Sequence, residues 1–140
     1  MAYLKIYPKR IIQNIQKMNE LMNIHDKEWS LVTKVLGGHK KTLKEILYSE
    51  AILGTHSIAD SRVSNLKVIK SIRDDLVTMY LKPPAKSYIK SVVKYADISL
   101  NTDYKTILAL NQEAKRENLI HKIIIMIELG ELREGVVRDK

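Results

Sequence analysis

The 140-residue sequence contains no cysteine. Without thiols, the chain can form neither a disulfide scaffold nor a zinc site with cysteine ligands, and it has no thiol nucleophile. Long apolar runs are also absent, because the longest one, Ile123 to Ile127, is far shorter than the roughly 20 residues that span a bilayer. The N-terminal residues "MAYLKIYPKR" lack the apolar segment of a secretory signal. We therefore expect a cytoplasmic protein that does not interact with membranes.

Acidic residues are fewer than basic ones: the chain has 16 aspartates and glutamates and 24 lysines and arginines, which gives a net charge of +8. A positive balance of this kind can indicate nucleic-acid binding. The basic residues are dispersed along the chain, however, and the cluster from His39 to Lys41 is short. No zinc-finger spacing and no aromatic-rich RNA-binding strand accompany them. We interpret the charge as solvated helix faces and expect no nucleic-acid partner.

Hydrophobic residues make up 45% of the chain, which is enough for the core of one domain spanning residues 1–140. Short apolar segments typical of strands alternate with stretches whose apolar residues recur every three or four positions, as in amphipathic helices. The expected strands are residues 3–7, 29–35, 56–60, 75–81, 96–101 and 121–129. This alternation predicts an α/β fold with a parallel sheet, which is either open and doubly wound or part of a closed barrel.

Two local features refine this pattern. The last expected strand, residues 121–129, contains a continuous apolar run, which is typical of a strand buried on both faces of a parallel sheet. Either Asn101 or Thr102 is placed to cap the helix that follows residues 96–101.

In both architectures the functional groups gather at the carboxyl ends of the strands. The residues expected there are Lys34, Asp60 to Arg62, Lys82, Asn101, and Glu128 to Arg133. No glycine-rich dinucleotide or Walker pattern follows any of the strands, which argues against a nucleotide site.

Lys34 is unusual because it lies at the end of an apolar, β-prone run and just before two glycines. Burying an ammonium group without a partner is unfavourable. From the residues alone, Lys34 either bends out to solvent, pairs with an anion, or does chemistry such as condensation with a carbonyl compound.

Three segments carry recognisable motifs: "VTKV" at residues 32–35, "ADSRVSNLKVIK" at residues 59–70, and a long segment, residues 95–136, that contains "ELGELREG". Together they resemble the alanine-racemase-like, fold-type-III pyridoxal-phosphate enzymes, most closely the ornithine-racemase branch. The resemblance extends over nearly the whole chain, and "ELGELREG" is its most specific part. It implies the N-terminal part of a (β/α)₈ TIM-type barrel with about five barrel strands, and residues 3–7 would form a leading strand outside the barrel.

The resemblance also implies roles for individual residues. In this family the lysine at the end of the first barrel strand carries pyridoxal 5′-phosphate, which makes Lys34 the expected catalytic and cofactor-binding residue. The family pattern acidic–x–glycine–x–x–arginine–x–glycine falls on Glu128, Gly130, Arg133 and Gly135. Arg133 would then lie beside the cofactor and the substrate carboxylate. The implied reaction is racemisation of a small-molecule amino acid, with the cofactor as electron sink.

The residues after Lys34 differ from those of classical alanine racemases. Those enzymes follow their lysine with an alanine-and-tyrosine stretch, whereas this chain has "VLGGH" up to His39, as in the ornithine-racemase branch. The difference argues against alanine as the substrate. We expect His39 to lie in a loop and to be solvated.

The chain is short for the family, since a complete barrel takes about 250 residues. We therefore expect an N-terminal fragment that has little or no racemase activity alone and forms a homodimer covering the edge near residues 123–129. Two alternatives stay open. One is a non-catalytic protein of the same fold that binds pyridoxal phosphate and serves cofactor homeostasis. The other is a basic nucleic-acid-binding domain.

Overall fold

A computed structural model describes residues 4–130, 132 and 134–137 of the chain. The helices and strands occur in the order α1 (Pro8–Ile24), β1 (Ser30–Val32), η1 (Lys34–Leu36), α2 (Lys40–Leu47), η2 (Glu50–Gly54), β2 (Ser57–Asp60), α3 (Val63–Ile72), β3 (Thr78–Tyr80), η3 (Lys86–Tyr88), α4 (Ile89–Tyr95), β4 (Ile98–Asn101), α5 (Tyr104–Arg116) and β5 (Lys122–Ile125), where η denotes a short 3₁₀ helix. Among the described residues, no helix is long and apolar enough to cross a membrane.

The sheet contains five parallel strands, and their order, β1-β2-β3-β4-β5, follows the chain. A doubly wound sheet reverses its strand order at a switch point, whereas a barrel adds each strand beside the previous one. The observed order therefore decides between the two architectures. The expected fold class is confirmed: the chain forms part of a TIM-type barrel, which is open at β1 and β5.

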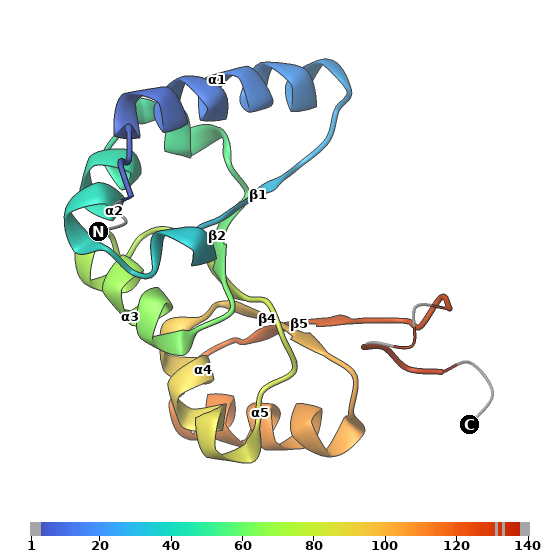
Figure 1. The fold of residues 1–140 in the computed structure, drawn as a ribbon. Helices are drawn as coiled ribbons and strands as arrows, with labels where there is room; N and C mark the ends of the chain where they lie inside the picture. Colours follow the sequence, from blue (N-terminus) through green and yellow to red (C-terminus); the bar gives the residue numbers. More distant parts are fainter. Residues whose placement is uncertain (1–3, 131, 133, 138–140) are drawn as a thin grey trace.

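The helices lie on one side of the strands, and the segment after β5 extends away from them (Figure 1). The main core lies between the helices and the sheet, and its large, fully buried apolar side chains are Leu43, Ile46, Leu47, Ile52, Ile58, Leu66, Ile69, Val92 and Leu110. A second, smaller cluster on the sheet joins Ala59, Met79 and Ile98. Because these three residues pair across β2, β3 and β4, they share the face that lines the interior of a closed barrel.

The N-terminal part differs from the expectation in two places. The described residues 4–7 have no regular secondary structure, so the leading strand expected at residues 3–7 is wrong for them, and residue 3 lies outside the described residues. A strand is stable only beside a hydrogen-bonded neighbour, and weak alternation does not provide one. β1 is also shorter than residues 29–35, because the chain turns at Thr33 into η1. Lys34 therefore lies just past the strand rather than inside it.

Helix α5 begins at a different cap from the one expected. The carboxylate of Asp103 accepts a hydrogen bond from the backbone N–H of Thr106 at 2.8 Å, and this bond holds the pKa of Asp103 below its usual value. Asn101 and Thr102 were the expected caps, and this prediction was wrong. Asn101 is instead fully buried at the end of β4, where its side-chain amide donates to the carbonyl of Ser99 at 2.9 Å.

Strand β5 has the expected position but not the expected burial. It pairs with β4 through Ile98↔Lys122 to Asn101↔Ile125, yet all of its residues are exposed. The prediction of burial on both faces was wrong because β5 is the last strand of the sheet. Among the described residues, no further strand pairs with its free side.

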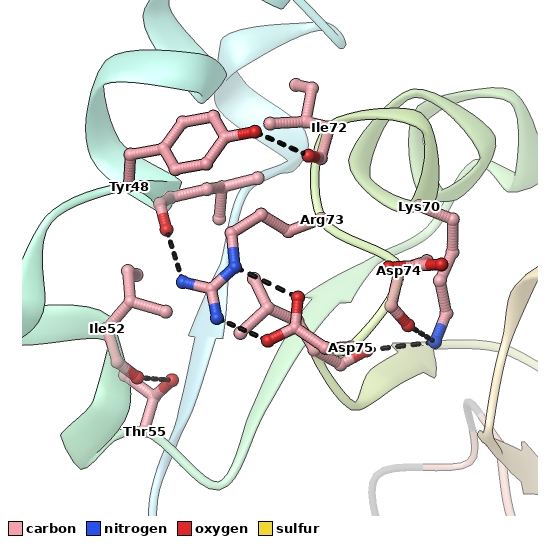
Figure 2. Close-up of polar contacts among 10 residues, drawn as sticks. Tyr48, Ile52, Thr55, Lys70, Ile72, Arg73, Asp74 and Asp75 are labelled. Atoms are coloured by element: carbon pink, nitrogen blue, oxygen red, sulfur yellow. Dashed lines mark hydrogen bonds and ion pairs between the residues drawn. The ribbon is translucent and has the colours of Figure 1, made fainter.

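Polar contacts close the amino-terminal end of the sheet, between α3 and β3 (Figure 2). The guanidinium group of Arg73 donates to the carbonyl of Leu47 at 3.1 Å and forms an ion pair with Asp75, which lowers the pKa of the Asp75 carboxyl. Lys70 pairs with Asp97 at 2.8 Å. These side chains lie at the end of the barrel where residues serve stability rather than chemistry.

His121 connects the loop before β5 to β4 through hydrogen bonds. Its Nδ1 lies 3.0 Å from the carbonyl of Ala96 and donates to it. In the neutral ring, Nε2 then accepts from the hydroxyl of Ser99 at 2.8 Å. Burial lowers the pKa of His121, although the Ala96 carbonyl and the charge of Asp97 act in the opposite direction.

This shift predicts a pH dependence of stability. The unfolded chain binds the His121 proton more tightly than the folded chain, so the contribution of His121 is fully present above its unfolded pKa of about 6.5 and falls as the pH is lowered below that value. In urea unfolding, the free energy of unfolding should fall between about pH 7.5 and about pH 5.5. His121→Gln should flatten this slope. A His121→Gln slope as steep as that of the wild type would contradict the assignment.

Candidate functional site

The carboxyl ends of the five strands lie along one edge of the sheet, because all the strands are parallel. The described residues that directly follow the strands there include Lys34, Ser61, Arg62, Leu81, Thr102 and Met126. The Lys34 turn follows β1, and the described residues 127–130 follow β5, so the structure places both at the same end of the sheet and on its opposite margins. In a closed barrel the first and fifth strands face each other across the interior.

Lys34 is the first residue of the 3₁₀ turn η1. Its side chain is exposed, and the described residues provide no ion pair or hydrogen bond to its amine. Of the three interpretations of Lys34 from the sequence, pairing with an anion within the described chain is therefore not observed. The exposed side chain agrees with the interpretation that Lys34 bends out to solvent, and a chemical role stays a prediction. The amine is accessible to a small molecule.

A buried polar network lies directly behind this turn. Thr33, which precedes Lys34, donates its hydroxyl to the carboxylate of Asp60 at 3.1 Å. Asn65 at the start of α3 donates to both oxygens of the same carboxylate at 3.2 Å. All three residues are buried. The sequence predicted a polar cluster of Asp60 to Arg62 at this strand end, and Asp60 is the one residue of it whose side chain belongs to this network. The contact with Thr33 connects residues too far apart in sequence for a local pattern to reveal.

Two glycines end the turn that carries Lys34, and both have positive φ angles: 58° at Gly37 and 74° at Gly38. A Cβ atom on Gly37 would meet no atom within 4 Å. A Cβ atom on Gly38 would lie 2.7 Å from Oδ1 of Asn65, whose amide is held by Asp60. The turn therefore packs closely against the buried network at Gly38 and leaves open space at Gly37.

The two glycines form a matched pair for mutagenesis. Gly37→Ala should cost only the strain of an alanine in the left-handed region, about 1 kcal/mol. Gly38→Ala should cost about 2–4 kcal/mol, because the new methyl group also displaces the buried amide of Asn65. Chemical unfolding of both variants measures the difference. Equal losses of unfolding free energy in the two variants would show that the Asn65 side chain can move aside without cost and that the turn is not packed against the network.

His39 occupies the position before α2, and its Nδ1 lies 2.8 Å from the hydroxyl of Thr42. The residue is exposed and belongs to the loop between η1 and α2, as the sequence predicted. Its ring contacts the beginning of a helix, which is a sufficient structural role.

Glu128, the first residue of the "ELGELREG" motif, forms hydrogen bonds to two described backbone groups of the same motif. The carboxylate of Glu128 accepts hydrogen bonds from the backbone N–H groups of Gly130 at 2.6 Å and Leu132 at 2.9 Å. Gly135 has a φ angle of 147°, and a Cβ atom there would lie 2.5 Å from the backbone nitrogen of Glu128. Glu128, Gly130 and Gly135 of the motif thus each have a structural role in the described backbone. Arg133 lies outside the described residues, so its predicted position beside the cofactor stays a prediction.

The described residues fit pyridoxal phosphate as a ligand of Lys34. An aldehyde cofactor needs an accessible primary amine, which Lys34 provides, and the open space at Gly37 lies beside the same turn. Among the described residues, no group of three histidine, aspartate or glutamate side chains could hold a metal ion.

Comparisons of the sequence with known proteins found two relatives. The chain is 37% identical to an ornithine racemase from Acetoanaerobium sticklandii over 137 residues, which cover 93% of this chain and 37% of the relative. It is 32% identical to a lysine racemase from Thermotoga maritima over 146 residues, which cover 96% of this chain and 39% of the relative. The chain thus spans less than two fifths of the length of either relative. No family model matches the sequence.

Comparison with solved structures supports the same fold. An alanine racemase from Clostridium difficile 630 superimposes with a TM-score of 0.71, at 15% sequence identity, over 94% of this chain and 33% of that chain. At this identity the likeness concerns the fold alone. A match to one third of a racemase chain agrees with the partial barrel seen here.

Proposed function

We propose a function for this chain from the premise that it belongs to the alanine-racemase-like family, in the ornithine-racemase branch. On that premise it forms part of the barrel of a cytoplasmic amino-acid racemase that uses pyridoxal 5′-phosphate. The observation that carries the proposal is Lys34, which follows β1 at the carboxyl end of the sheet with an accessible amine. Ornithine and lysine, after which the two relatives are named, are the substrates that we propose.

Three residues of this chain would have distinct roles in the proposed reaction. Lys34 would hold the cofactor, and its Nζ atom could also take a proton from one face of the substrate α-carbon. The cofactor supplies an electron sink that makes this proton acidic. Arg133 would offer a fork of donors to a carboxylate or phenolate oxygen, a geometry that lysine cannot provide. Glu128 would fix the backbone of the loop that carries Arg133.

The described part of the barrel lacks groups that the proposed racemisation needs. Racemisation needs a base on each face of the α-carbon, and Lys34 serves only one of them. The barrel is also open at β1 and β5, so water reaches the site from both sides. We therefore propose that the 140-residue chain binds the cofactor weakly and racemises its substrate slowly or not at all.

A chimera tests this proposal. The part of the Acetoanaerobium sticklandii ornithine racemase that lies beyond the match would be joined to the end of this chain, and D- and L-ornithine, lysine and alanine would be assayed by chiral chromatography. We expect racemisation of ornithine or lysine by the chimera, none above the cofactor background by the chain alone, and none by a chimera with Lys34→Ala.

Two results would contradict the proposal: robust racemisation by the chain alone, or an active Lys34→Ala chimera. A folded chimera that binds the cofactor at Lys34 without racemising any of the three amino acids would favour the non-catalytic cofactor-binding alternative. Circular dichroism and a melting curve of each chimera establish that it is folded.

We also propose that the isolated chain forms a homodimer through β5. Its exposed isoleucines and its unpaired edge are the support for this proposal, because an uncovered sheet edge with apolar side chains favours pairing with another chain.

A further inference from the structure

We infer that Asp60 is a positioning residue for Lys34: its buried carboxylate fixes the backbone on both sides of the turn that presents the lysine amine. This inference rests on the proposed function, since it concerns the same amine. Asp60 is fully buried at the end of β2 and contacts neither Lys34 nor a cation among the described residues.

The carboxylate of Asp60 is held by hydrogen-bond donors alone. It accepts from the hydroxyl of Thr33 at 3.1 Å, from the backbone N–H of Arg62 at 2.9 Å, and from the amide of Asn65 at 3.2 Å to each oxygen. These donors come from the end of β1, from the residue before α3 and from α3 itself. A buried carboxylate without a cation needs several donors, and such bonds to a charged group are the stronger kind.

The contact with Thr33 fixes the turn on its N-terminal side. Thr33 is buried, and its backbone N–H donates to the carbonyl of Ala59 at 2.9 Å, which continues the β1–β2 ladder by one residue. Its own carbonyl accepts from the N–H of Leu36 at 2.9 Å and so begins the 3₁₀ turn. The hydroxyl of Thr33 also lies 3.3 Å from the carbonyl of Ala59, and Asp60 is its nearer acceptor at 3.1 Å. The residue immediately before Lys34 is therefore tied to β2 by its backbone and its side chain.

The contact with Asn65 fixes the turn on its C-terminal side. Gly38 packs so closely on Asn65 that a single methyl group would come within 2.7 Å of its Oδ1 atom. Asp60 holds the other end of the same amide and thereby sets which atom faces Gly38. Within the turn, the N–H of Gly37 donates to the carbonyl of Lys34 at 3.2 Å. Lys34 is thus presented by a short turn that contacts the Asp60 carboxylate directly through Thr33 and indirectly through Asn65.

A purely structural role of Asp60 would predict something different. If the network only joined β1, β2 and α3, its loss would lower stability without changing how Lys34 reacts relative to other lysines. If it positions Lys34, its loss should specifically slow the reaction of Lys34, because misplacing a reactive group by about 1 Å can slow a reaction by as much as about 100-fold.

The test labels the full 140-residue chain with pyridoxal 5′-phosphate and cyanoborohydride. The lysine amine condenses with the aldehyde carbon and releases water, and hydride from the reagent reduces the resulting C=N bond to a stable secondary amine. Peptide mass spectrometry then gives the rate of labelling at Lys34 divided by the rate at the exposed Lys44. We expect this ratio to fall about tenfold in Asp60→Asn.

Matched variants keep the test decisive. Thr33→Val removes only the hydroxyl and should lower the ratio, whereas Thr33→Ser retains it and should restore most of the wild-type ratio; this pair serves if Asp60→Asn does not fold. Asp75→Asn removes another hydrogen-bonded carboxylate, at the opposite end of the sheet, and should lower the melting temperature without changing the ratio.

Amide hydrogen exchange of residues 34–38 separates the two proposals. Faster exchange there in Asp60→Asn and Thr33→Val, but not in Asp75→Asn, supports the fixing of the turn by Asp60, whether or not the cofactor binds. A wild-type chain that does not label Lys34 in preference to Lys44 would contradict the proposed function. Hydrogen exchange would still test whether Asp60 fixes the turn of residues 34–38. Unchanged labelling ratios in folded Asp60→Asn and Thr33→Val would overturn the positioning role.

Discussion

Ile124→Lys is expected to convert the self-associated chain into a monomer. Ile123, Ile124 and Ile125 of β5 are 38%, 42% and 55% exposed, and the strand has an unpaired edge beside them. On the helix side, Ile123 borders a groove of about 360 Å³ against α5 that Leu108 and Leu119 also line. Apolar side chains on a free edge favour pairing with a second chain, and a lysine there opposes it.

Sedimentation velocity over a range of concentrations measures this effect. The wild type should shift toward a dimer as the concentration rises, and Ile124→Lys should sediment as a monomer at every concentration. Ile24→Lys is the matched control, because Ile24 is 78% exposed at the end of α1, a helix that lies apart from β5 (Figure 1). A wild-type chain that stays monomeric at high concentration, or an Ile24→Lys chain that dissociates equally, would contradict the role of β5.

Lys34→Ala is expected to abolish the specific binding of pyridoxal phosphate. The amine of Lys34 is exposed and has no partner among the described residues, so nothing competes with an aldehyde for it. In a titration with the cofactor, without dialysis because binding is weak, the wild-type chain should show the absorbance of a protein-bound imine. The variant should lose essentially all of it, since an alanine has no group that condenses with an aldehyde.

Two further variants distinguish covalent attachment from charge attraction. Lys34→Arg keeps the positive charge but does not form the imine, so it should behave like Lys34→Ala. Lys41→Ala removes an exposed lysine from the neighbouring helix α2 and should leave the absorbance unchanged. Retention of the band in Lys34→Arg, or its loss in Lys41→Ala, would show that another residue holds the cofactor.

The order of strands and helices could be predicted from the sequence because it rests on short-range patterns. Val63, Leu66, Ile69 and Ile72 recur every three positions, a spacing typical of an amphipathic helix, and α3 runs over Val63–Ile72. The residues at the strand ends could also be placed, since parallel strands bring their carboxyl ends to one edge. The choice between an open sheet and a barrel needed either the family resemblance or the observed strand order.

Features that depend on distant neighbours could not be predicted in this way. The apolar run of β5 has the same composition whether or not a further strand covers it, so its exposure was not visible in the sequence. The bond between Thr33 and Asp60 joins residues 27 positions apart. The turn at Lys34 was closer to being predictable, because two successive glycines after residue 36 favour the left-handed conformations that end it.

A crystal structure of the chain grown with pyridoxal phosphate tests the central claim most directly. The account predicts continuous electron density from Nζ of Lys34 to the aldehyde carbon of the cofactor, at the carboxyl end of β1 and beside Gly37. Density for the cofactor on a different lysine, or a cofactor bound without any link to Lys34, would contradict it.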